Sequence, residues 1–264
     1  MRWATSRGHR DAYNFPMRRY PGLSALLLAV LLPSPIASAQ HWVDTWAAAQ
    51  QIPESANALP AARLRDSTIR EVFHVSLGGS ILRVRLSNVF GTEPLRFTSV
   101  HIARPIPSPA QPAPQPGAAP PIGPSIDPAT DGAVTFSGNP GVTVPAGSEY
   151  LSDPIQFSLP ALSDVAVSFH LDTPPAVETG HPGSRETTFI AHGDLTAAPD
   201  MPDAQQVDHW YQVSGIDVEA PPDAGAIVAL GDSITDGHAT TTNANNRWTM
   251  CLRSGCRPRR SQRI

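Results

Sequence analysis

One serine lies where a buried strand would meet a turn. Residues 226–230 (AIVAL) form a continuous apolar run, and residues 231–237 (GDSITDG) follow it directly. An uninterrupted run of this kind predicts a strand buried on both faces, as in a parallel sheet covered by helices. Open α/β sheets bind their ligands at the carboxyl ends of such strands, so we expect Ser233 to face a binding site.

A serine on a sharp strand-to-helix turn can do nucleophilic chemistry. Its hydroxyl can attack a carbonyl carbon while its own backbone amide stabilises the resulting oxyanion. Gly231 permits a tight turn, and Asp232 can support that turn by holding neighbouring amides. Two other interpretations stay open: Ser233 as a plain helix N-cap, and a phosphate-binding loop, which lacks a supporting Lys or second Gly cluster.

Residues 226–237 resemble the first conserved block of the SGNH, or GDSL-type, esterase and lipase superfamily. The stretches 42–48, 84–91, 152–154 and 214–220 are similar to the β-rich amino-terminal region of a secreted subgroup of that family. The resemblance implies that Ser233 is the nucleophile and that its amide is one oxyanion donor. It also implies an ester substrate, such as an acylated carbohydrate or lipid, and an acyl-enzyme route that needs no metal or organic cofactor.

The chain departs from this family after the first block. The family supplies a Gly, an Asn and a D-x-x-H pair far downstream, whereas 31 residues follow Ser233 here and no D-x-x-H occurs. His238 is close in sequence and is a poor candidate for the missing base. The other histidines of the body precede the block, where strand or loop surface roles are favoured. We therefore predict an inactive chain that exposes apolar surface and is poorly folded after residue 220.

The amino-terminal 39 residues have the order of a secretory signal peptide. Arg18 and Arg19 precede an apolar run at 23–32, and Ala37-Ser38-Ala39 gives a cleavage site after Ala39. The run is too short to span a bilayer, so no permanent membrane anchor is expected. Residues 1–16 indicate an over-extended start. The predicted location is secreted or periplasmic.

The carboxyl-terminal residues 249–264 differ from the rest of the chain. They show no helical or strand period and are predicted to be an out-of-frame tail. A genuine basic tail and a terminus closed by a Cys251–Cys256 disulfide remain alternatives. A zinc site at these cysteines lacks further ligands nearby.

Residues 40–220 predict an antiparallel β-sandwich. Segments 68–77 and 81–87 flank Gly78-Gly79 and are interpreted as a hairpin, with Glu71 interrupting the apolar face of the first strand. Leu82, Val84 and Leu86 are expected to point inward. Further strands are predicted at 95–102, 133–136, 142–144, 155–159, 165–171, 187–191 and 210–218.

The predicted fold class is therefore mainly β, with a sandwich followed by the first strand-turn-helix of a truncated α/β, flavodoxin-like SGNH hydrolase domain at 221–248. Residues 104–128 contain ten of the 29 prolines and predict an extended, solvated insertion in the sandwich.

Charge excludes one class of partner. Between residues 40 and 250 the chain carries nine Arg and 22 acidic residues, a balance that disfavours nucleic acid. A secreted β-sandwich module that binds carbohydrate or another partner is the alternative function. Trp42, Trp46, Trp210 and Tyr211 could supply stacking surfaces for it, although such residues more often pack in a core.

Overall fold

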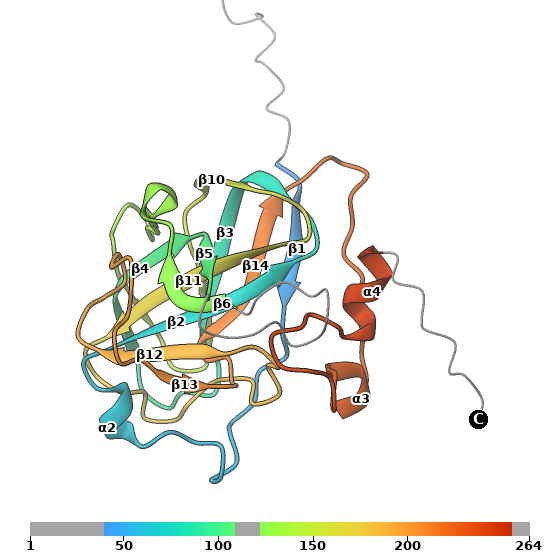
Figure 1. Ribbon diagram of the computed structural model, residues 1–264. Helices are drawn as coiled ribbons and strands as arrows, with labels where there is room; N and C mark the ends of the chain where they lie inside the picture. Colours follow the sequence, from blue (N-terminus) through green and yellow to red (C-terminus); the bar gives the residue numbers. More distant parts are fainter. Residues whose placement is uncertain (1–39, 109–121, 255–264) are drawn as a thin grey trace, which may run out of the picture. The chain divides into compact units, whose positions relative to one another are not determined.

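The computed structural model describes residues 40–108 and 122–254 (Figure 1). The predicted signal peptide and the end of the predicted tail lie outside these residues. The described part is mainly β, as predicted, and every strand pairing in it is antiparallel. Among the described residues, no helix is long and apolar enough to span a membrane.

A five-stranded sheet has the order β1-β14-β3-β10, with β9 also paired to β3. Its central strand β3 is apolar on one face, where Leu82, Val84 and Leu86 are fully buried as predicted. Arg83 and Arg85 point the other way and pair with Asp217 of β14. The bounds of the strands are β1 Trp42–Ala47, β3 Gly79–Asn88, β9 Ser148–Leu151, β10 Ile155–Leu159 and β14 Val213–Glu219.

A seven-stranded sheet has the order β13-β12-β2-β11-β4-β7, with β8 also paired to β4. In the strand predicted at 165–171, alternate residues point into the core that this sheet shares with the other: Val165, Val167, Phe169 and Leu171. The strands are β2 Ser67–Val75, β4 Leu95–Ala103, β7 Gly132–Ala133, β8 Val142–Val144, β11 Ser163–Leu171, β12 Thr188–His192 and β13 Gln205–Val207.

The predicted hairpin at Gly78-Gly79 is wrong, because its two strands belong to different sheets. β2 pairs with β11 and β12, whereas β3 pairs with β14, β10 and β9. The link between them is a corner, where the Leu77 amide donates to Thr45 Oγ1 at 2.8 Å. Apolar stripes that face each other across a core alternate just as paired strands do, so periodicity could not separate the two arrangements.

The Pro-rich insertion begins and ends in a two-stranded sheet, formed by β5 (Pro105–Pro107) and β6 (Ile122–Ile126). Its middle, 109–121, lies outside the described residues. The short 3₁₀ helix η2 (Pro128–Thr130) then returns the chain to β7. One further short helix, α2 (Ala61–Leu64), precedes β2.

Three of the four candidate stacking aromatics belong to the core. Trp46, Trp210 and Tyr211 are buried, and the Trp46 ring lies 4.2 Å from Phe73 and 4.7 Å from Trp210, measured between centroids. The Trp210 indole donates to the Val72 carbonyl at 3.1 Å. These rings join the sheets and offer no face to a sugar.

The buried strand predicted at 226–230 is not formed. Ile227, Val228 and Leu230 are 84%, 88% and 98% exposed, and these residues have no regular secondary structure. A strand that is apolar on both faces needs neighbours at both edges, and none lies beside it in the described part of the chain. The predicted exposure of apolar surface is confirmed.

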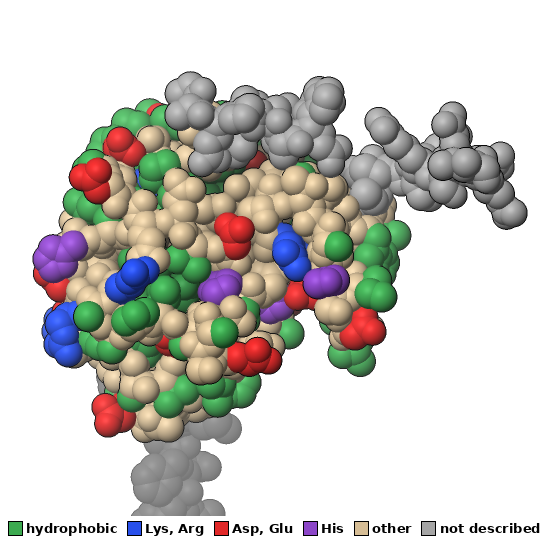
Figure 2. Space-filling model, turned by 60° about the horizontal axis from the view of Figure 1, so that its bottom comes forward, with side chains coloured by type: hydrophobic (Ala, Val, Ile, Leu, Met, Phe, Trp, Pro, Cys, Tyr) green, Lys and Arg blue, Asp and Glu red, His purple; other side chains and the backbone are tan. Residues whose placement is uncertain are grey.

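Two short helices follow this segment, α3 (Ser233–Asp236) and α4 (Trp248–Ser254). α4 corrects the expectation that residues after 248 lack helical structure, and Met250, Leu252 and Arg253 are residue types with high helix propensity. Figure 2 shows hydrophobic side chains along the right edge of its view, where α3 and α4 lie in Figure 1.

Candidate functional site

Ser233 is the first residue of α3, and the turn around it is held by its neighbours. Asp232 is the N-cap, and its Oδ1 accepts a hydrogen bond from the Ile234 amide at 3.0 Å. The helix ends at Gly237, whose φ of 100° lies in the left-handed region that glycine tolerates. The N-cap role considered for Ser233 thus belongs to Asp232.

The Ser233 side chain is exposed, and its hydroxyl contacts no hydrogen-bonding group in the described residues. The Ser233 carbonyl accepts from the His238 amide at 2.6 Å. The His238 Nδ1 lies 3.4 Å from Arg185 Nη2, so the guanidinium and not the serine engages this nitrogen. The described structure therefore provides an accessible hydroxyl without a base.

Asp236, at the end of α3, fixes the segment to the β-sheet body. Its Oδ1 lies 2.8 Å from Nε2 of His181, whose Nδ1 lies 2.6 Å from the Ala49 carbonyl. Both ring nitrogens thus face hydrogen-bond acceptors. Burial opposes ionisation of Asp236, but the hydrogen bond and charge of His181, with the charges of Arg247 and Arg185, outweigh it and lower the pKa of Asp236.

Arg247 lies behind this ion pair. It is buried, its Nε donates to the Asp236 carbonyl at 3.0 Å, and its guanidinium lies 5.2 Å from the Trp210 ring centroid. Burial lowers the pKa of Arg247, and the charges of Glu186 and Asp236 oppose that shift. Burial also raises the pKa of Glu186 to about 8, so this carboxyl is mostly protonated at pH 7.

A second group of contacts holds the loop between α3 and α4. The Asn243 side chain accepts from the Thr187 amide at 2.8 Å and donates to the Thr187 hydroxyl at 2.9 Å. The Asn243 amide donates to the Arg185 carbonyl at 2.9 Å. Residues 236–247 are therefore docked on the loop before β12, which corrects the expectation of poor folding throughout the stretch after 220.

The sequence motif identifies Ser233 and Asp232, but no local sequence signal identifies the groups that dock them. A surface role was expected for His181, yet its side chain is only 12% exposed and bridges two distant segments. His181 and Asp236 are 55 residues apart and belong to no common motif. The close approach of Gly183 to Asp236, where a Cβ would lie 2.3 Å from Oδ2, likewise has no sequence signal.

The described residues contain no group of three or more His, Cys, Asp or Glu side chains that could hold a metal ion. No protein-family model matches the chain, and a search of curated proteins finds no significant match.

Proposed function

We propose that this chain carries the amino-terminal part of an exported serine ester hydrolase of the SGNH type, with Ser233 as its nucleophile. The observation that supports the proposal best is the apolar run 226–230, which has no regular secondary structure and is almost fully exposed shortly before an accessible serine. A segment of this composition is stable in water only when other strands and helices cover it. Such cover is what the remainder of an α/β hydrolase domain would supply.

The reaction would proceed through an acyl-enzyme. The Ser233 hydroxyl attacks the ester carbonyl and loses its proton to a base, while the Ser233 amide donates to the oxyanion. The tetrahedral intermediate then collapses and expels the alcohol, which takes up the proton held by the base. Water hydrolyses the acyl-enzyme and releases the acid. Asp232 acts as a positioning residue, since its carboxylate holds the turn through the Ile234 amide.

We expect the described part of the chain to lack this activity by itself. His181 pairs with Asp236 of α3 and His238 directly follows its C-cap, and both rings are engaged by groups other than Ser233. Without a base, hydroxyl attack loses several orders of magnitude in rate. Hydrolysis of a p-nitrophenyl ester by the 264-residue chain that disappears in Ser233→Ala would contradict this expectation.

The proposal is tested at the gene and then with protein. The coding DNA should be resequenced across Arg247 and translated onward in all three frames. A frame that supplies the Gly, Asn and D-x-x-H blocks supports the esterase, and the protein expressed from it should hydrolyse p-nitrophenyl esters. Ser233→Ala should lower the rate of that hydrolysis by several orders of magnitude, whereas Ser158→Ala, which removes an exposed hydroxyl on β10, should not. A frame without these blocks, or a hydrolysis rate left unchanged by Ser233→Ala, refutes the proposal.

A further inference from the structure

The side chains of Thr98, His170 and Asp66 form a row, linked by hydrogen bonds, on the outer face of the seven-stranded sheet. Thr98 Oγ1 is 2.5 Å from His170 Nδ1, and His170 Nε2 is 3.0 Å from Asp66 Oδ1. A carboxylate can only accept, so Nε2 carries the proton toward Asp66. Nδ1 is then free to accept the proton of the Thr98 hydroxyl. This is the proton arrangement of a nucleophile, its base and the group that orients the base.

A β-bulge turns the threonine toward the histidine. In the pairing of β4 with β11, Ser99 lies opposite His170 and Phe97 lies opposite Leu171, so Thr98 is an extra residue. Phe97 and Val100 both point into the core, which leaves Thr98 and Ser99 together on the outer face. A regular strand would have put one of the two inside. Bulges re-aim side chains in this way and are frequent beside active sites.

The other two members of the row are also held in place. Asp66 has a φ of 47°, in the left-handed region that non-glycine residues seldom adopt. Its amide donates to the Asp172 carbonyl at 3.3 Å, and its carbonyl accepts from the Gly193 amide at 2.7 Å. The His170 side chain is 8% exposed, so its ring is shielded from competing water. The position of the His170 ring is therefore fixed by packing as well as by its hydrogen bonds.

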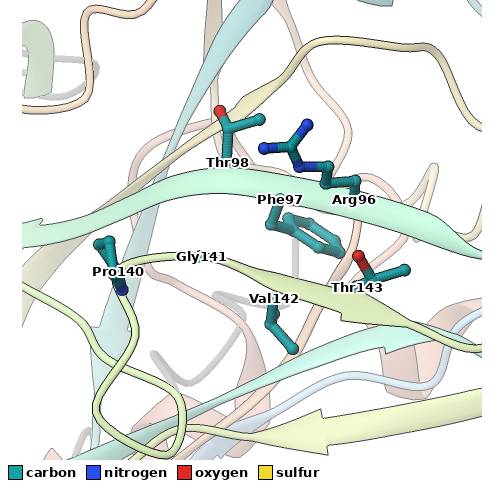
Figure 3. A pocket seen from close by; sticks show the side chains of 7 residues that line it. All are labelled: Arg96, Phe97, Thr98, Pro140, Gly141, Val142 and Thr143. Carbon is teal, nitrogen blue, oxygen red and sulfur yellow. The ribbon is translucent and has the colours of Figure 1, made fainter.

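A cavity of about 250 Å³ adjoins the threonine (Figure 3). It is lined by β4 and by the segment from Pro140 to Thr143. Figure 3 shows Thr98 and Arg96 on the same side of β4. Arg96 is largely exposed and pairs with Asp172 at 3.2 Å, so its guanidinium can turn toward an anion that forms near Thr98. The size of the cavity suits a small acyl group.

We propose that Thr98, His170 and Asp66 form a second nucleophilic site, which accepts a small acyl group from an ester. Thr98 Oγ1 bonds to the carbonyl carbon as its proton passes to His170 Nδ1. The carbon–alkoxide bond breaks, and the leaving alcohol takes that proton from Nδ1. Water then attacks acyl-Thr98, gives one proton to His170, and releases the carboxylic acid as Thr98 regains its proton. The net reaction is ester plus water to acid plus alcohol.

The test uses the purified chain with p-nitrophenyl acetate, an acid quench and fragment-ion mass spectrometry. We expect an acetyl group on Thr98, retained in Thr98→Ser and absent in Thr98→Val. His170→Gln should lower the acylation rate about 100-fold, because general-base assistance is lost. Ser99→Ala is the matched control, since Ser99 is the adjacent outward hydroxyl and bonds Thr196 instead. It should acylate at the wild-type rate.

Asp66→Asn is a second variant that tests the site if His170→Gln, which changes a buried residue, does not fold. The Asp66 side chain is half exposed, and Asn tolerates the left-handed conformation, so we expect an unchanged unfolding midpoint. Acylation should nevertheless fall about tenfold or more, as the base loses its orienting charge. A purely structural Asp66 would leave that rate unchanged.

Ser233→Ala separates this site from the proposed esterase serine and should acylate normally at Thr98. Acetylation found only at Ser233, an unmodified Thr98 in folded wild-type protein, or modification that persists at full rate in folded His170→Gln or Asp66→Asn would each overturn the inference.

Discussion

At the scale of single residues, the most unusual group is the carboxyl of Glu71, which lies inside the core. It is fully buried on β2, and it accepts a hydrogen bond from the Tyr211 amide. Burial raises its pKa from 4.5 to about 8, against the opposing effect of that hydrogen bond. Glu71 is therefore mostly protonated in the folded protein at pH 7. In the sequence, Glu71 interrupts an apolar face, but no neighbouring residue indicates that its carboxyl is neutral in the folded protein.

This pKa predicts how stability depends on pH. The folded state keeps a proton that the unfolded state releases above pH 4.5, so the stabilising effect is complete below that pH and is lost as pH rises through about 8. We expect Glu71→Gln, which mimics the protonated side chain, to remove this dependence of stability on pH. Urea unfolding of both proteins between pH 5 and pH 8 measures it, with a slope of up to about 1.4 kcal/mol per pH unit for each such group.

Glu186 has a pKa of about 8 for the same main reason, so some slope should remain in Glu71→Gln. Glu54→Gln is the control, because Glu54 is exposed and its side chain makes no hydrogen bond in the described residues. It should leave the wild-type slope intact. If Glu71→Gln and wild type lose stability equally with pH, Glu71 is already ionised in the folded protein.

At the scale of elements, the corner at Gly78 decides which sheet each strand joins. A Cβ built on Gly78 would lie 2.4 Å from the Leu159 carbonyl oxygen and 2.5 Å from the Ala161 nitrogen. Both are backbone atoms and cannot move without displacing the end of β10. We expect Gly78→Ala to lower the free energy of unfolding by about 1–3 kcal/mol, the usual cost of overpacking.

Gly225→Ala is the matched control for the corner. No atom lies within 4 Å of a Cβ built there, and its φ is not positive. Chemical denaturation should show this variant to be as stable as wild type. Equal stability of the two alanine variants would mean that the corner adapts at no cost.

Elements were easier to predict than their partners. Alternation in 165–171 and 81–87 located β11 and β3 correctly, because one buried face imposes a period of two. The pairing partner depends on residues far away in the chain, so β2 and β3 were wrongly joined. The strand predicted at 226–230 is not formed for a related reason. A strand that is apolar on both faces is stable only inside a sheet, whose other strands come from elsewhere in the chain.

At the scale of the whole described body, the segment carrying Ser233 is held by a few polar contacts. The motif located Ser233 and Asp232 from sequence alone. The docking site could not be found in that way, because His181, Thr187 and Asp236 meet only after the sheets have formed.

This docking should weaken when the Asp236–His181 pair is broken. The lowered pKa of Asp236 means that its stabilising effect is present at neutral pH and is lost as pH falls below about 4 through the folded-state value. We expect Asp236→Asn to reproduce the acid effect at pH 7. Hydrogen exchange followed by mass spectrometry should show faster exchange of the amides of 236–247, with the amides of β11 unchanged.

Asp232→Asn separates loss of docking from loss of the helix. It lies on the same short helix, and asparagine caps helices as well as aspartate does, so α3 should remain intact. Wild-type exchange in Asp232→Asn together with fast exchange in Asp236→Asn would assign docking to the ion pair. Slow exchange in Asp236→Asn would instead assign it to the Asn243 and Arg247 contacts, which do not need the Asp236 carboxylate charge.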